Sequence, residues 1–170
     1  MKLRFFLFSM LFAIFANFAK SEVDTKKYQE LSTDVVKAMP EEYKNKRICF
    51  ETVFVRYETT FLPYMEKSGY RPGKYYYLQV KPSNFPVMAE KNDLTNAIIP
   101  SLKAGSKVKL YGKVKKFSSS PEVGVFPVFH LELDHIEVIE IGNGKISEED
   151  KKDALTPRQK DIIKRKLHDR

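Results

Sequence analysis

The stretch KVKLYGKVKKF, residues 107–117, alternates apolar and polar side chains with the period of two that is typical of a β-strand. One face carries Val108, Leu110 and Val114 around Gly112. The opposite face carries lysines and aromatic residues, namely Lys107, Lys109, Tyr111, Lys113, Lys115 and Phe117. The pattern predicts a half-buried strand whose outer face either binds a polyanion or is solvated.

Four further segments on either side of this stretch have the composition of strands, and they are 47–60, 74–81, 85–90 and 125–141. In the last of them the apolar positions change parity at Asp134-His135, which predicts a β-bulge or a sharp coil. A short helix that begins at Asn92 or Asp93 and ends at Gly105 is expected between the third and fourth strands.

The first 21 residues have the layout of a secretory signal peptide. Two basic residues precede an uncharged run over 5–18, and Ala19-Lys20-Ser21 follows. We expect cleavage after Ser21 and therefore a periplasmic or secreted protein. The uncharged run is shorter than the roughly 20 residues of a membrane-spanning helix, so we expect no stable membrane span.

Charge and cysteine content limit the choice of partners. Three of the 30 basic residues lie in the expected signal peptide, which leaves 27 against 22 acidic residues and a net charge of +5. A charge of this size also serves solubility and does not require a polyanionic partner. The single cysteine, Cys49, excludes an internal disulfide and is expected to be a buried, inert thiol.

Three units are expected after the signal peptide (1–21): an N-terminal helix in 22–45, a β-rich core in 46–141 and a basic helical tail in 142–170. The helix is predicted over 23–39, because its apolar residues recur in steps of three and four. In the tail, a capping pattern at residues 156–159 precedes an apolar stripe, and that stripe is Ile162, Ile163 and Leu167.

The order of long bent strand, strand, short strand, helix, strand and strand resembles the OB-fold. This is an all-β, five-stranded Greek-key barrel whose helix lies between strands three and four in most members. The residues that carry the resemblance are GSKVKLYGKV, 105–114, and FHLELDHIEVIE, 129–140. With its signal peptide, the chain is similar to the small periplasmic OB-fold proteins of bacteria, a group mostly without enzymatic activity.

The resemblance implies a ligand surface, because OB-folds usually bind ligands across the second and third strands, between the first and last loops. The implied residues lie on the outer side of strand 74–81 and in the apolar loop 61–73. They are Tyr75, Tyr77, Gln79, Lys81, Phe61, Tyr64 and Tyr70. The ligand would be a small polar molecule, an oligosaccharide or an exported protein, while packing inside the barrel is an equally good explanation of the tyrosines.

Nucleic acid is the alternative partner. Its bases would stack on the tyrosines, and the lysine row of Lys107, Lys109, Tyr111, Lys113 and Lys115 would follow the phosphates. However, an exported protein meets little nucleic acid, and alternating lysines also protect an exposed strand from pairing with others. We therefore favour a solvated lysine row.

No catalytic set is recognisable, and we expect neither enzyme activity nor a cofactor. A calcium-dependent nuclease needs clustered carboxylates, whereas acidic residues such as Asp93 and Asp134 are scattered. His130 and His135 are five residues apart on one expected strand, so strict pleating would place them on opposite faces. Two such histidines could not share a metal ion, and we predict no metal site.

Overall fold

The computed structural model describes residues 24–81, 85–121, 124 and 126–145. The expected signal peptide and nearly all of the expected basic tail, including its apolar stripe, lie outside these residues. The described helices include none that is both long and apolar enough to cross a membrane.

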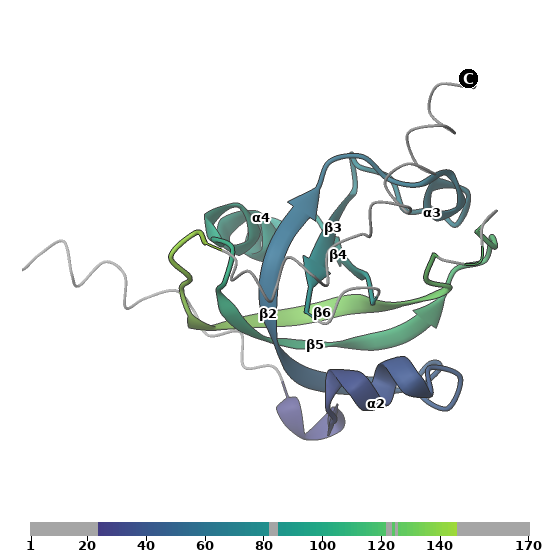
Figure 1. Cartoon of the computed structure of the whole chain (residues 1–170), viewed down its shortest axis with the longest axis horizontal. Coiled ribbons are helices and arrows are strands. Elements are labelled where there is room, and N and C mark those ends of the chain that lie inside the picture. Colours follow the sequence, from purple (N-terminus) through teal and green to yellow (C-terminus); the bar gives the residue numbers. More distant parts are fainter. Residues whose placement is uncertain (1–23, 82–84, 122–123, 125, 146–170) are drawn as a thin grey trace, which may run out of the picture.

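Six strands form one sheet that closes on itself (Figure 1). They are β1 (Gln29–Glu30), β2 (Arg47–Glu58), β3 (Tyr75–Val80), β4 (Val87–Glu90), β5 (Lys107–Lys116) and β6 (Phe129–Glu140). The order in the sheet is β1-β2-β3-β4-β6-β5, and β2 also pairs with β5. Because of this extra pairing, the five strands after β1 form a continuous ring.

The order of elements along the chain agrees with the sequence analysis. The helix α4 (Asp93–Ile98) lies between β4 and β5, and a short 3-10 turn, η3 (Ile99–Ser101), follows it. A capping box starts α4: the Asn92 side chain accepts from the Thr95 main-chain N–H, and the Thr95 hydroxyl accepts from the Asn92 N–H, both over 2.9 Å. The mostly β fold predicted from the sequence is thus confirmed.

The main apolar core fills the inside of the ring. Ile48, Phe50, Leu78, Leu110 and Leu131 come from four different strands, and none is more than 1% exposed. Each such side chain contributes about 1.5–3 kcal/mol through burial. The alternation that predicted these strands is the same alternation that directs every second residue into this core.

A β-bulge interrupts β6 at Asp134, which is one of the two explanations that the change of parity allowed. Tyr111 of β5 pairs with His135, but the next residue, Gly112, pairs with Leu133. One residue of β6 is therefore left without an opposite partner, and the strand after it presents the other set of side chains to the core.

The bulge also changes the faces of the two strand histidines. Lys115 lies opposite His130 and Tyr111 lies opposite His135. Lys115 and Tyr111 share one face of β5, so His130 and His135 share one face of β6. The expectation that they point to opposite faces is wrong, because it assumed an unbroken pleat.

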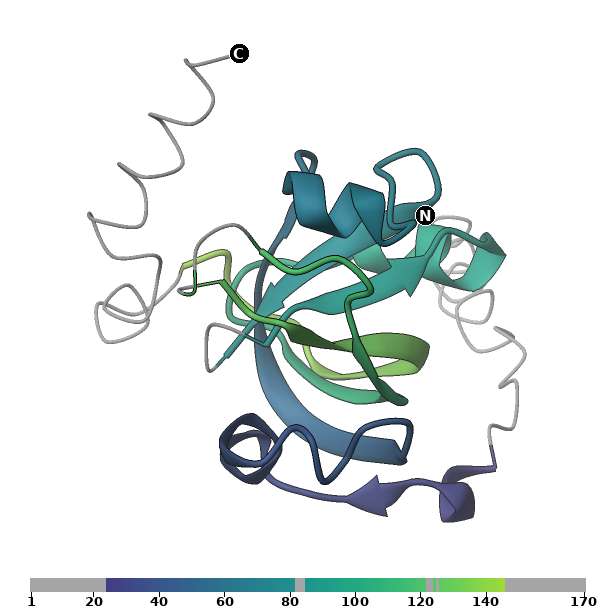
Figure 2. The same cartoon turned by 90° about the vertical axis from the view of Figure 1, so that its right-hand side faces the viewer.

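The helix predicted over 23–39 is wrong in its first half. The 3-10 turn η2 (Thr25–Lys27) leads into β1, which pairs with β2 in parallel, and only α2 (Thr33–Ala38) is helical (Figure 2). Tyr28 explains the extended backbone. Its ring packs edge-on against Tyr111 at 5.4 Å between centroids, and its hydroxyl donates to Asp134 over 2.9 Å.

Candidate binding surface on strands β2 and β3

The first loop, residues 59–74 between β2 and β3, folds back onto the sheet. It contains the short helix α3 (Pro63–Lys67), which begins with a proline at the first helical turn, although only a loop was expected there. In Figure 1, α3 and α4 lie on opposite sides of β3 and β4. Side chains of this loop join others to form a second apolar group, the aromatic cluster, whose buried members are Phe61, Tyr64, Met65, Tyr70, Met88 and Phe117.

Three residues of the implied ligand surface lie inside this cluster. Phe61, Tyr64 and Tyr70 are only 5%, 5% and 9% exposed. Burial raises the pKa of the Tyr64 and Tyr70 hydroxyls above the ordinary value. These side chains therefore pack against protein and offer little area to a ligand.

The last loop, residues 117–128 between β5 and β6, meets the first loop over the cluster. The Tyr64 hydroxyl donates to the Pro127 main-chain oxygen over 3.1 Å, and the Ser119 N–H donates to the Ser68 hydroxyl over 3.0 Å. The Phe117 ring packs edge-on against Tyr64 at 5.1 Å. The two loops that flank the ligand in OB-folds thus contact each other.

A buried histidine lies at the centre of the cluster. His130 is fully buried, its Nε2 lies 2.6 Å from the Tyr70 hydroxyl, and its ring stacks on Phe117 at 4.1 Å. Desolvation lowers the pKa of His130 to about 3, so the ring is neutral at pH 7. Its Nδ1 has no hydrogen-bond partner among the described residues.

A second β-bulge, in β2, brings an arginine to the outer face of the ring. Phe54 pairs with Val80, but Arg56 pairs with Gln79, so Val55 is bypassed in the ladder. With an unbroken pleat Arg56 would share the inward face of Phe54. Alternation alone therefore missed this residue, and the alternating residues around it gave no signal of the bulge.

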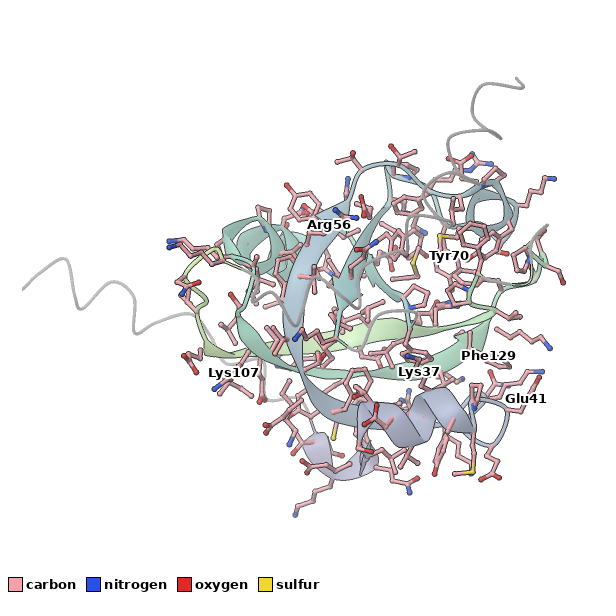
Figure 3. All side chains as sticks on the ribbon, in the orientation of Figure 1. Lys37, Glu41, Arg56, Tyr70, Lys107 and Phe129 are labelled. Atoms are coloured by element: carbon pink, nitrogen blue, oxygen red, sulfur yellow. The ribbon has the colours of Figure 1, made fainter. Side chains whose placement is uncertain are left out.

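Arg56, Glu58, Tyr75, Tyr77 and Gln79 share this outer face, and we call them the β2–β3 surface. The Nε of Arg56 lies 2.8 Å from a Glu58 carboxylate oxygen and 3.2 Å from the Gln79 amide oxygen. The side chain of Arg56 remains 55% exposed, and Figure 3 shows it near the end of β2. Burial raises the pKa of Tyr77 to about 12, so its hydroxyl stays protonated.

The aromatic cluster packs against the two tyrosines of this surface and partly buries them. The Tyr77 ring packs edge-on against Phe61 at 6.0 Å, and Tyr75 packs edge-on against Tyr70 at 4.9 Å. Figure 3 shows Tyr70 between α3 and the sheet. Lys81, the last residue of the implied set, follows β3, and its N–H donates to the Val53 oxygen over 2.9 Å.

The lysine row is largely paired with carboxylates. The ammonium-to-carboxylate distances are 2.9 Å for Lys107–Glu140, 3.0 Å for Lys109–Glu30 and 3.4 Å for Lys115–Glu132. Tyr111 is only 4% exposed and lies under Tyr28, while Lys113 shares the same face of β5. Exposed pairs of this kind are weak, at about 0–1 kcal/mol, but they interrupt the positive strip that a phosphate backbone would need.

The described residues contain no group of three or more His, Cys, Asp or Glu side chains placed to hold a metal ion. The prediction that the chain has no metal site concerns the whole chain and stays a prediction.

Comparison with known proteins identifies similar solved structures but no family. No protein family and no curated protein matches the chain. Asparaginyl-tRNA synthetase from Pyrococcus horikoshii gives a TM-score of 0.49 at 16% identity, over 76% of this chain and 27% of that one. Aspartyl-tRNA synthetase from Entamoeba histolytica gives 0.48 at 10% identity, over 65% and 22%.

A smaller protein, OBody AM3L09 bound to hen egg-white lysozyme, gives a TM-score of 0.43 at 8% identity, over 59% of this chain and 88% of that one. The present chain matches only about a quarter of each synthetase. All three TM-scores are below 0.5, so no function follows from these similarities.

Proposed function

We propose that this chain is an exported, non-enzymatic OB-fold barrel that binds its ligand on the β2–β3 surface. The ring order of the strands supports the OB-fold assignment, and the surface lies on the strands where OB-folds bind ligands. The observation that carries the proposal is the fixed polar group of Arg56, Glu58 and Gln79 beside two supported tyrosine rings. Polar groups held in place before binding lower the entropic cost of binding.

The chemistry of the surface favours a neutral polar ligand, and an oligosaccharide fits it best. The charges of Arg56 and Glu58 offset each other, so the surface does not select a strongly charged partner. The guanidinium group donates hydrogen bonds, and the Glu58 and Gln79 oxygens accept them, which suits sugar hydroxyls. The rings of Tyr75 and Tyr77 supply the apolar wall against which a sugar ring can pack.

Titration with a panel of neutral oligosaccharides, followed by calorimetry and amide chemical shifts, tests this function. We expect Arg56→Gln and Gln79→Ala each to weaken binding about tenfold or more, since each removes about 1.4 kcal/mol or more of hydrogen bonding. Lys107→Gln, on β5 and outside the surface, should bind as the unmodified chain does. Binding that is unaffected by both surface variants would contradict the proposal.

Single-stranded nucleic acid is the second candidate, because two tyrosines carry a lysine over their rings. The Lys74 ammonium lies 5.6 Å from the Tyr75 ring centroid, and the Lys91 ammonium lies 4.9 Å from that of Tyr76. Aromatic rings next to cations are what single-strand binding proteins use. Lys74 also pairs with a Glu90 carboxylate over 3.2 Å, as the lysines of the row pair with theirs, so the candidate depends mainly on Lys91.

A salt titration with a labelled single strand separates the two candidates. If nucleic acid is the ligand, the association constant should fall steeply between 50 and 200 mM salt, with roughly the slope of several phosphate contacts. Binding should also weaken in the double variant Lys74→Gln plus Lys91→Gln. Lys109→Gln plus Lys113→Gln is the matched control on the lysine row. No binding at low salt would eliminate this candidate, and metal-dependent hydrolysis by the purified chain would contradict a non-enzymatic module.

Export is part of the proposal and has its own test. Protein recovered from the periplasm or the medium should begin at Glu22 when its N-terminus is sequenced. Recovery of an unprocessed chain from the cytoplasm alone would contradict export while leaving the binding surface unaffected.

A further inference from the structure

An apolar strip lies at the end of β6. Val138, Ile139 and Ile141 are 39%, 51% and 66% exposed. They make up most of the exposed large apolar side chains that the described residues contain. Single exposed apolar residues are ordinary, but three within four positions form a patch that calls for a covering partner.

The strip lies on an open edge of the sheet. β4 pairs with β6 only as far as Leu133, and beyond that residue β5 is the one described strand that pairs with β6. The backbone edge that faces away from β5 is therefore unpaired along the strip among the described strands. Exposed apolar edges of this kind are usually covered by another element.

The chain leaves the described part right beside the strip. The Gly142 N–H donates to the Ser106 hydroxyl over 2.9 Å, and the Gly144 N–H donates to the Ala104 oxygen over 3.2 Å. A Cβ at Gly142 would collide with the main chain of Ala104 and Ser106, so the two segments are in close contact. Residues 146–170 therefore start from a fixed point a few residues beyond Ile141.

The sequence of those 25 residues supplies a complementary face. Ile162, Ile163 and Leu167 are spaced by one and four residues, which places them on one side of a helix that starts at the capping pattern 156–159, and Leu155 directly precedes that pattern. The ten residues from Lys145 to Leu155 can span up to about 33 Å, so this face can reach the strip. The surrounding residues are mostly basic, whereas Glu137 and Glu140 flank the strip.

We propose that residues 157–167 form a helix that packs its apolar face across the strip of Val138, Ile139 and Ile141. A second copy of the chain is a poorer occupant. Three partly exposed side chains offer a few hundred Å² of apolar surface, whereas a stable dimer interface buries roughly 1,200 Å² or more in total. A segment tethered a few residues away needs no such area, because the tether gives it an effective concentration of about a millimolar.

Hydrogen exchange in the full chain tests the proposal. The double variant Ile163→Asp plus Leu167→Asp should lower the protection of the amides of residues 137–141 about tenfold or more and increase the fluorescence of an apolar dye. Amides of residues 108–114, in the middle of β5, should be unaffected. The control Lys164→Asp plus Arg165→Asp adds two carboxylates on the side of the helix away from Ile162, Ile163 and Leu167, and it should leave both readouts unchanged.

A double-mutant cycle tests whether the tail substitutions act through contact with the apolar strip on β6. In a chain that carries Ile139→Asp, the tail variant should have no further effect on protection or thermal midpoint. Equal protection of residues 137–141 with and without the tail substitutions would overturn the proposal. Protection that rises with protein concentration, together with a dimer in sedimentation, would also overturn it in favour of a second copy.

Discussion

The hydroxyl of Tyr64, in α3, donates a hydrogen bond over 3.1 Å to the main-chain oxygen of Pro127, in the last loop. This bond joins two loops that lie about sixty residues apart in the sequence. Phe61, Tyr64 and Tyr70 in the aromatic cluster are buried, so the proposed ligand surface is limited to the β2–β3 surface.

Tyr64→Phe should lower the free energy of unfolding by about 1 kcal/mol, because it removes one partly buried hydrogen bond and keeps the ring. Urea unfolding measures the loss, and hydrogen exchange should quicken at residues 118–121. Tyr57→Phe is the control, since its ring is 40% exposed. Equal losses in the two variants would show that the Tyr64 bond does not hold the loops together.

His130 should make the protein less stable in mild acid. Burial lowers the pKa of His130 to about 3, whereas the unfolded side chain has a pKa near 6.5. As the pH falls below about 6.5, the unfolded state binds a proton that the folded state excludes, so stability decreases by up to about 1.4 kcal/mol per pH unit.

Urea unfolding at several pH values between 5 and 7 measures this dependence. The variant His130→Gln should show a smaller slope with pH in that window, although its stability at pH 7 will be lower because the ring is lost. Identical slopes in the two proteins would mean that His130 is not buried as a neutral ring.

Gly112→Ala should be strongly destabilising. A Cβ there would lie 2.9 Å from Cγ of Leu131 and closer still to the main-chain oxygen of Glu132. We expect a loss of about 2–4 kcal/mol in thermal or urea unfolding, since main chain must shift to make room. Gly73→Ala is the matched control, because nothing lies within 4 Å of its Cβ position, and it should be neutral or slightly stabilising.

Cys49 should react slowly with a thiol reagent until the N-terminal segment opens. The thiol is 4% exposed beneath Tyr28 and Tyr111, and burial raises its pKa. Tyr28→Ala should accelerate labelling about tenfold or more, whereas Lys26→Ala should not, both measured where circular dichroism shows a folded chain. Equal labelling rates would contradict the covering role of Tyr28.

The strands were predictable because the alternation of apolar and polar residues within each strand determines which of its side chains face the core. The bulge at Asp134 was predictable for the same reason, since apolar residues on both sides of it record the change of face. The bulge at Val55 was not, because Arg56, Tyr57 and Glu58 lie at the polar end of β2, where no apolar pattern marks the inner face.

Long-range contacts account for the remaining differences. Residues 23–39 have a helical spacing of apolar residues, but Tyr28 reaches Tyr111 and Asp134, far along the sequence, only from an extended backbone. Likewise, the apolar residues of the first loop were expected to bind a ligand, whereas Tyr64 in that loop packs against Phe117 from the last loop. Contacts between residues this far apart in the sequence cannot be predicted from the local spacing of apolar residues.

The double pairing of β2 also determines when the protein can fold. Residues 47–53 form their ladder with residues 107–113, so about sixty residues must be available before the first strand can complete its hydrogen bonds. A nascent chain that stops short of β5 therefore has an unclosed sheet, and one that stops short of β6 has no link between β4 and β5. Folding must wait until nearly all of residues 47–140 have been synthesised.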